Sequence, residues 1–313
     1  MENISVLRGR AANALVAAAV AFSASAADYN WTGLGDGHSW SDANNWTNES
    51  GTAVAPTPAN NVKHSYWFPV DDTGLVVTQD LSGAIFISDL TFERMGTAPV
   101  TVEFASKALD YVLTFGASST VDVPDGMTLL WKTDGNRWSN SDISKNGAGK
   151  MVFDMIRSPQ TQRGLVVNAG TVEVAPTSAD TKFHVKMGGS DLANLPVFVN
   201  HKDGQVIGGL DTLRNGGTVD LDGKTVKIGA SAPMTGSTNL LPSIVADSGT
   251  LAFQNERVAK LSEMTSSFGL TLDRADVIVP DFGGAAIDWK FDDASDPTKD
   301  DVGFGSRMIV SGR

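Results

Sequence analysis

Short runs in which apolar and polar residues alternate dominate the chain, and the clearest of them lie between Ile143 and Val174. Apolar residues alternate from Met151 to Met155 and again from Leu165 to Val174, and glycines precede or interrupt both runs. A period of two is typical of β-strands, and glycine marks the turns between them. Strands this short cannot bury a face alone. The stretch therefore predicts one coil of a β-solenoid that is stacked between similar coils.

A second pattern occurs four times: a small residue, threonine, an apolar residue, a variable residue and another apolar residue. The copies begin at Ser119, Gly170, Gly217 and Gly249. Their apolar pairs lie two residues apart, hence on one face of a strand, so each copy supplies two core positions. Their spacing is irregular. Between and around the copies the alternation predicts further strands at His64–Val70, Leu75–Thr78, Ala84–Phe92, Val100–Phe104, Tyr111–Phe115, Met127–Trp131, Lys182–Val185, Pro196–Val199, Thr225–Ile228, Ser243–Val245, Val277–Val279, Ala286–Phe291 and Arg307–Val310.

This density of strands predicts an all-β fold, and it fits both a parallel β-helix (solenoid) and an antiparallel β-sandwich. The segments Asn168–Gly170 and Asn215–Gly217 supply residues that tolerate positive φ, as a corner between two sheet faces requires. These corners favour the solenoid. One helix is predicted at Gln254–Phe268, where apolar residues recur on a single helical face.

The N-terminus has the pattern of a secretory signal peptide over residues 1–26. Arg8 and Arg10 form a basic region, an apolar region runs from Ala11 to Phe22, and small residues precede a cleavage site near Ala26. The apolar region is too short and too rich in alanine for a good membrane span. We therefore expect a secreted protein with no transmembrane segment in the mature chain.

Residues 27–61 form a tryptophan-rich segment with a connector rich in proline and asparagine. Trp31, Trp40 and Trp46 are separated by turn-forming residues, which predicts short strands that are each anchored by one indole. Such rings are suited to closing the open end of a solenoid against water, as an N-terminal aromatic cap. Stacking on a sugar ring is the alternative role for the same three residues. Residues 62–313 then form the solenoid itself.

Charge and cysteine content narrow the function classes. Among 313 residues, 36 are acidic and 24 are basic, giving a formal net charge of −12, which repels polyphosphates and so argues against nucleic acid as a partner. The chain has no cysteine, so it has neither disulfides nor thiol chemistry. A large β core that is stable without cross-links is the expected result.

Candidate chemistry is sparse, because the sequence has no nucleophile elbow, phosphate loop, zinc motif or dinucleotide fingerprint. Asp292, Asp293, Asp296 and Asp300 share one acidic loop, which predicts either a calcium site or a solvated loop. No other cofactor is expected. Four carboxylates in outward strand positions could bind calcium or catalyse acid–base chemistry on a polysaccharide, or could simply solvate the sheet: Glu103, Asp122, Glu173 and Asp220.

The residues around Lys145 resemble the autotransporter-associated β-strand repeat, also called the passenger-associated transport repeat. Lys145, Gly147 and Gly149 precede the pair Met151 and Phe153, and the segment Gly164–Val172 supplies the valine-rich strand that ends in Asn-Ala-Gly-Thr. The sequence departs from the family in its methionines and in a longer, charged turn. The N-terminal Trp-Thr-Gly segment is also similar to the start of large exported proteins that carry this repeat. The resemblance implies an exported, right-handed parallel β-helix of the autotransporter-passenger type.

Taken together, these patterns predict a non-enzymatic structural or adhesive protein that displays loops on a rigid β-solenoid. Its location would be the bacterial cell surface or the medium, and its partners would be extracellular polysaccharides or cell-surface components. The alternative prediction is a carbohydrate-binding or polysaccharide-degrading β-helix protein, in which carboxylates and aromatic residues converge in one cleft.

Overall fold

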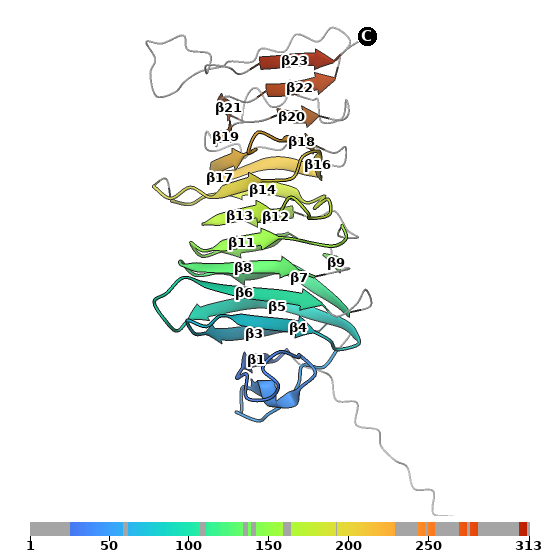
Figure 1. The fold of residues 1–313 in the computed structure, drawn as a ribbon, viewed down its shortest axis with the longest axis vertical. Coiled ribbons are helices and arrows are strands. Elements are labelled where there is room, and N and C mark those ends of the chain that lie inside the picture. Colours follow the sequence, from blue (N-terminus) through green and yellow to red (C-terminus); the bar gives the residue numbers. More distant parts are fainter. Residues whose placement is uncertain are drawn as a thin grey trace, which may run out of the picture.

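The computed structural model is a stack of β-strand coils with a small N-terminal unit at one end (Figure 1). It describes residues 26–58, 62–106, 111–133, 137–138, 142–158, 164–191, 193–228, 243–247, 250–253, 269–273, 276–280 and 307–311. The predicted helix at 254–268 and the predicted strand at 286–291 lie outside these residues. The all-β fold class is confirmed.

The described part of the chain contains 23 strands and one short 3-10 helix. In chain order they are β1 (Asp28–Trp31), η1 (Ala43–Asn45), β2 (Trp46–Asn48), β3 (Lys63–Val70), β4 (Leu75–Gln79), β5 (Gly83–Arg94), β6 (Val100–Ser106), β7 (Tyr111–Asp122), β8 (Met127–Lys132), β9 (Arg137–Trp138), β10 (Ile143–Asn146), β11 (Lys150–Phe153), β12 (Gly164–Val167), β13 (Thr171–Val174), β14 (His184–Gly188), β15 (Val197–Asn200), β16 (Gln205–Ile207), β17 (Gly209–Asp220), β18 (Thr225–Ile228), β19 (Ser243–Asp247), β20 (Thr250–Phe253), β21 (Gly269–Asp273), β22 (Asp276–Pro280) and β23 (Arg307–Ser311).

The strands stack into three faces that run along the axis. The first face contains β3, β5, β7, β10, β12, β14 and the start of β17. The second contains β4, β6, β8, β11, β13, β15 and the end of β17, continued by β19 and β21. The third contains β16, β18, β20, β22 and β23. All of these pairings are parallel, which excludes the antiparallel sandwich.

The stretch from Ile143 to Val174 holds parts of two coils, so the prediction of a single coil was wrong. Ile143 pairs with Leu165 on the first face, and Met151 pairs with Val172 on the second. One coil therefore returns to the same position after roughly twenty residues, and neighbouring strands lie about 4.8 Å apart. The sequence shows both strand runs clearly, but an alternating pattern does not reveal which runs share a coil.

The four threonine-led segments lie on different faces of the solenoid. Thr171 and Thr218 both pair with Val197 on the second face, whereas Thr120 pairs with Ser144 on the first face. Thr250 pairs with Thr225 on the third face. The pattern is a general form for a strand with one inward face, so it recurs wherever the backbone enters a sheet from a corner.

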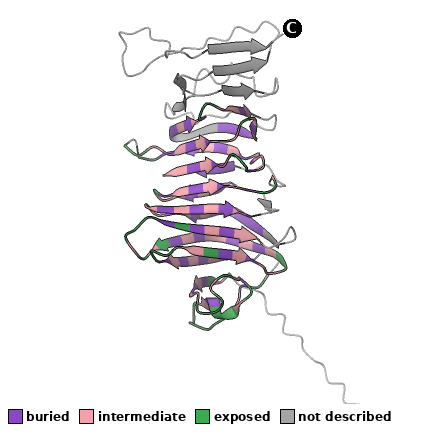
Figure 2. Cartoon of the chain, viewed as in Figure 1, coloured by how far each residue is buried: buried purple, intermediate pink, exposed green. Residues whose placement is uncertain are grey.

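The core is the closed interior of the stack, and buried and partly exposed residues alternate along each strand (Figure 2). On the second face, one inward position carries a fully buried side chain in five successive coils: Val77, Phe104, Trp131, Phe153 and Val174. The rings of Phe104 and Trp131 stack with centroids 4.9 Å apart. Burial of such side chains stabilises each by roughly 2 kcal/mol, so adjacent coils supply one another's core.

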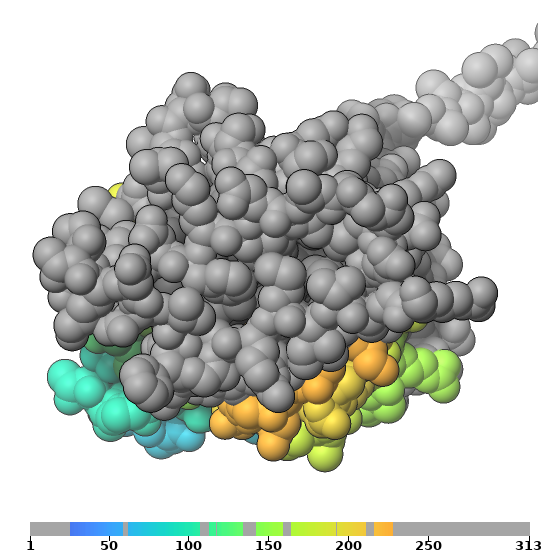
Figure 3. Space-filling view, turned by 90° about the horizontal axis from the view of Figure 1, so that it is seen from above, coloured from blue at the N-terminus to red at the C-terminus, as the bar shows by residue number. Residues whose placement is uncertain are grey.

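Viewed from above, described residues in colours from cyan to orange appear together along one margin of the molecule (Figure 3). No helix among the described residues is long and apolar enough to cross a membrane.

Stacked coils predict an elongated particle. A compact globule of this length would have a radius of gyration of about 19 Å. We expect small-angle X-ray scattering to give a clearly larger value, with a pair-distance distribution skewed to long distances. A symmetric distribution with a radius near the globular value would contradict the stacked architecture.

Candidate functional site

The three tryptophans of the N-terminal segment lie in the core rather than on the surface. Trp31 is 3% exposed, and Trp40 and Trp46 are fully buried. The Trp46 ring lies edge-on to Trp31 at 4.9 Å and to Trp40 at 5.0 Å, while Trp40 also contacts Phe104 of the second coil face at 5.6 Å. These contacts match the predicted aromatic cap. A sugar ring could stack on any of these indoles only if the cap opened.

Asn45 fixes the loop that surrounds these rings. Its Oδ1 accepts hydrogen bonds from the backbone N–H groups of Gly35 and Gly37, and its Nδ2 donates to Asp36 and to the Ser39 carbonyl. Hydrogen bonds from Ser39 and His38 lower the pKa of Asp36 below its usual range. The glycine-rich loop is thus a folded part of the cap, as its turn-forming residues indicate.

Trp67, among the described aromatic residues, points outward. Burial alternates along β3, so Tyr66 and Phe68 are buried while Trp67 is half-buried on the outer surface of the first face. In the outward column it neighbours Thr91, then Asp122. The sequence predicts a single strand over His64–Val70. The period-two alternation that places Tyr66, Phe68 and Val70 on one face was the available signal.

The outward carboxylates do not converge in a cleft. Glu103, Glu173 and Asp220 share one column of the second face, but Leu130 and Val152 separate the first pair and Val199 the second. The two glutamates instead form ion pairs with basic residues of neighbouring coils, Glu103 with Lys132 at 2.9 Å and Glu173 with Lys150 at 2.6 Å.

A longer series of polar side-chain contacts crosses the coils at one end of this column. Glu173 lies between Lys150 and His201, and the His201 Nδ1 atom is 2.9 Å from the Asp222 carboxylate. The hydrogen bond to His201 lowers the pKa of Asp222. These side chains link the coils of β11, β13, β15 and β17. Their geometry matches a surface tie between coils.

The predicted calcium ligands Asp292, Asp293, Asp296 and Asp300 lie outside the described residues. Within the residues that the structure describes, no cluster of three or more histidine and carboxylate side chains could hold a metal ion.

Lys145 is the most unusual side chain of the described core. It occupies an inward position that Val121 fills in the coil before and Val167 in the coil after, and it is fully buried. Its Nζ donates hydrogen bonds to the carbonyl oxygens of Gly147 at 2.5 Å, Gly149 at 2.6 Å and Ala169 at 2.9 Å. The first two belong to its own corner and the third to the corner of the next coil. One ammonium group therefore ties two coils together.

The glycines of the corner make this approach possible. Gly147 has a φ of 73°, and a Cβ there would lie 2.2 Å from the Val123 carbonyl oxygen of the preceding coil. Gly170 has a φ of 65°, and its Cβ would lie 2.3 Å from the Gly149 carbonyl oxygen. Corners of successive coils thus pack backbone against backbone. Their carbonyl groups converge on the space that the Lys145 ammonium occupies.

Two further contacts reinforce these coils. Asn168 donates from Nδ2 to Asn146 Oδ1 at 2.9 Å, next to the lysine on the outer side of the corner. Lys186 forms an ion pair with Asp142 at 2.7 Å across the intervening strand β12, where Gly164 leaves room for it. The lysine and glycines that the repeat pattern singled out are therefore structural ties between coils.

Comparisons with known proteins give no independent support for a family: no family model matches the chain, and neither a curated protein nor a solved structure matches it. The resemblance to the autotransporter-associated repeat thus rests on the residues of the repeat.

Removal of the Lys145 ammonium leaves three carbonyl groups in the core without their donor. We expect Lys145→Met to lower the free energy of unfolding by about 2–4 kcal/mol at pH 7, measured by urea denaturation. Lys150→Met, which removes a partly exposed ion-pair partner one strand away, is the matched control and should cost less than about 1 kcal/mol. Equal losses for both variants would contradict the tie between coils.

The same lysine predicts a dependence of stability on pH. Burial lowers the pKa of Lys145 to about 8, against a smaller opposing effect of the Asp122 carboxylate. The unfolded chain keeps its proton up to about pH 10.4, so the folded state alone releases the proton between these values. The stability of the wild type relative to Lys145→Met should therefore increase by about 3 kcal/mol from pH 8 to pH 10.4. A flat difference across that range would contradict the buried charge.

Proposed function

We propose that this chain is an exported, non-enzymatic structural or adhesive protein that displays loops along a rigid β-solenoid. The observation that carries the proposal is the tie at Lys145, where a fully buried ammonium joins the corners of two coils. Such a group adds no chemistry at the surface and holds the coils in register. It is what a stalk needs, because a stalk must keep its shape over its whole length.

The polar surface supports the same proposal. The outward carboxylates Glu103 and Glu173 pair with lysines of adjacent coils, and Lys202 pairs with Asp180 at 2.7 Å at another corner. Each pair neutralises charges between coils along the axis. Surface pairs of this kind contribute only a few tenths of a kcal/mol each, yet in series they favour one alignment of coils.

Export is supported by the sequence of the N-terminus, whose basic, apolar and small-residue regions are ordered as in a signal peptide. The absence of cysteine fits a protein whose stability comes from stacked strands. The proposed location is the bacterial cell surface or the medium.

The proposal is tested by producing the full chain in a Gram-negative host and analysing the periplasm, the outer membrane and the medium. We expect an exported form that begins at or next to Ala27, identified by mass spectrometry of its N-terminal peptide. Ala26→Arg, at the predicted cleavage site, should retain an unprocessed precursor, whereas Ser23→Ala should be processed normally. Accumulation of uncleaved wild-type chain in the cytoplasm would overturn the export proposal.

Carbohydrate binding is the second candidate function, and Trp67 is the observation that favours it. The half-buried indole lies on the outer side of the first face, in register with Asn30 and Thr91, and Asp122 follows in the next coil. An aromatic ring next to such groups can stack on a sugar and hydrogen-bond its hydroxyls. The carboxylates favour a neutral glycan over an anionic one.

Affinity electrophoresis in gels containing neutral or anionic polysaccharides separates the two candidates. Binding through Trp67 predicts retardation by a neutral polymer that Trp67→Ala weakens at least tenfold and that Val76→Ala, on the second face, leaves unchanged. Unaltered migration of the wild type in every gel would contradict carbohydrate binding and would agree with a purely structural role.

A further inference from the structure

Gln79 is a fully buried polar side chain whose hydrogen-bonding atoms have no partner. Neither its Oε1 nor its Nε2 forms a hydrogen bond with another described group, and the residue is 0% exposed at the end of β4. An amide in this state costs free energy, because it has lost its water and gained nothing in return. The Trp40 Nε1 and the Tyr66 hydroxyl are buried nearby in the same condition.

The register of the strands brings these groups together at the capped end of the solenoid. Ser39 forms a β-bridge with Thr78, and the backbone N–H of Trp40 donates to the Thr78 carbonyl. Trp40 therefore lies beside Gln79 in the adjacent layer. The Trp40 and Tyr66 rings are in contact, with centroids 4.8 Å apart. Trp40 of the cap thus lies next to both Tyr66 of the first face and Gln79 of the second face, and each of the three residues carries an unpartnered polar group.

Other buried polar groups nearby show what a satisfied interior looks like. The Trp46 Nε1 donates to the Trp40 carbonyl at 3.1 Å, and Asn45 uses both atoms of its amide. Gln79, the Trp40 indole and the Tyr66 hydroxyl thus differ from neighbouring polar groups that the protein itself satisfies.

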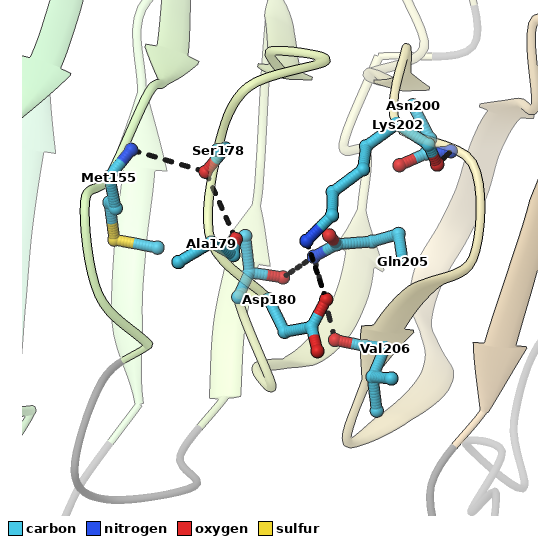
Figure 4. A network of polar contacts seen from close by, with 9 residues as sticks. Met155, Ser178, Ala179, Asp180, Asn200, Lys202, Gln205 and Val206 are labelled. Carbon is cyan, nitrogen blue, oxygen red and sulfur yellow. Dashed lines mark hydrogen bonds and ion pairs between the residues drawn. The ribbon is translucent and has the colours of Figure 1, made fainter.

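A second position further along the stack repeats the situation. The Gln205 Nε2 donates to the Thr181 hydroxyl at 2.8 Å. Figure 4 shows Gln205 beside the ion pair of Lys202 with Asp180. The Gln205 Oε1 and the Asn200 Oδ1 are buried without a hydrogen-bond donor. Asn200 ends β15 on the second face, as Gln79 ends β4, and Gln205 begins β16 on the third face.

We propose that the interior of the solenoid binds ordered water at the end of the second face, with a principal site formed by Gln79, Trp40 and Tyr66. The unpartnered atoms of the site include a donor on the indole, a donor and an acceptor on the amide, and a hydroxyl that can serve as either. Water is the ligand that satisfies such a mixed set, and buried waters in proteins typically make about three hydrogen bonds to groups of this kind.

The tyrosine is uncharged at this site. Burial raises the pKa of the Tyr66 hydroxyl well above its usual value, so the group stays neutral and keeps its proton to donate. A neutral phenol, an indole and an amide together carry no charge. The site therefore suits a neutral ligand and disfavours a free ion.

The decisive experiment compares crystal structures and thermal stabilities of the wild type and Gln79→Met. The proposal predicts an ordered water within hydrogen-bond distance of the Gln79 amide in the wild type. In Gln79→Met, which keeps the length of the side chain without its polar atoms, that water should be lost or shifted, and the melting temperature should fall by several degrees.

The opposite result is equally clear, because an amide that is truly unpartnered would be better replaced by an apolar group. A rise in the melting temperature of Gln79→Met, or a dry site in the wild-type crystal, would overturn the proposal. Asn45→Leu is the control for an amide that protein groups satisfy, and it should destabilise the protein in either case. The wild-type crystal alone decides the matter if the variant fails to fold.

Discussion

Parallel pairing between coils is the constraint on which the rest of this structure depends. Every strand in the interior of the stack satisfies its backbone N–H and C=O groups only through the coil before it and the coil after it. The same neighbours supply the other half of each core layer, as Phe104 and Trp131 show. No coil is therefore stable alone, and an open end needs a separate solution. The buried indoles of Trp40 and Trp46 provide it at the N-terminal end.

Polar groups inside the solenoid act on register more than on gross stability. An apolar interior tolerates small shifts between coils, because one aliphatic contact resembles another. The Lys145 ammonium does not, since its three acceptors belong to fixed points on two corners. A hydrogen-bonded charge in the core thus selects one alignment among several that bury similar area, which is the best-attested use of buried polar groups.

Much of the architecture was predictable from the sequence, because strands need only local alternation to be recognised. The prediction of a strand at Thr225–Ile228 agrees with the structure at both ends, and most others agree within a few residues. The arrangement of the strands around the solenoid axis was harder to predict from the sequence. Local patterns did not show that Ile143–Val174 spans two coils, or that the threonine-led segments lie on three different faces. Those facts depend on which corner each strand follows. For the surface, sequence identified the acidic positions but not their lysine partners, which come from other coils.

The position of Lys145 also bears on how the molecule responds to mechanical load. Inter-strand hydrogen bonds run along the axis, so a pull on the two ends would open coils one at a time instead of shearing a whole sheet at once. When coils open one after another, the resisting force at each step is set by the contacts of a single coil. The Lys145 ammonium, which bonds to Gly147 in its own corner and to Ala169 in the next, adds a charge-assisted bond across that step. It would therefore interrupt the progress of unzipping and divide the stack into segments that yield at different forces.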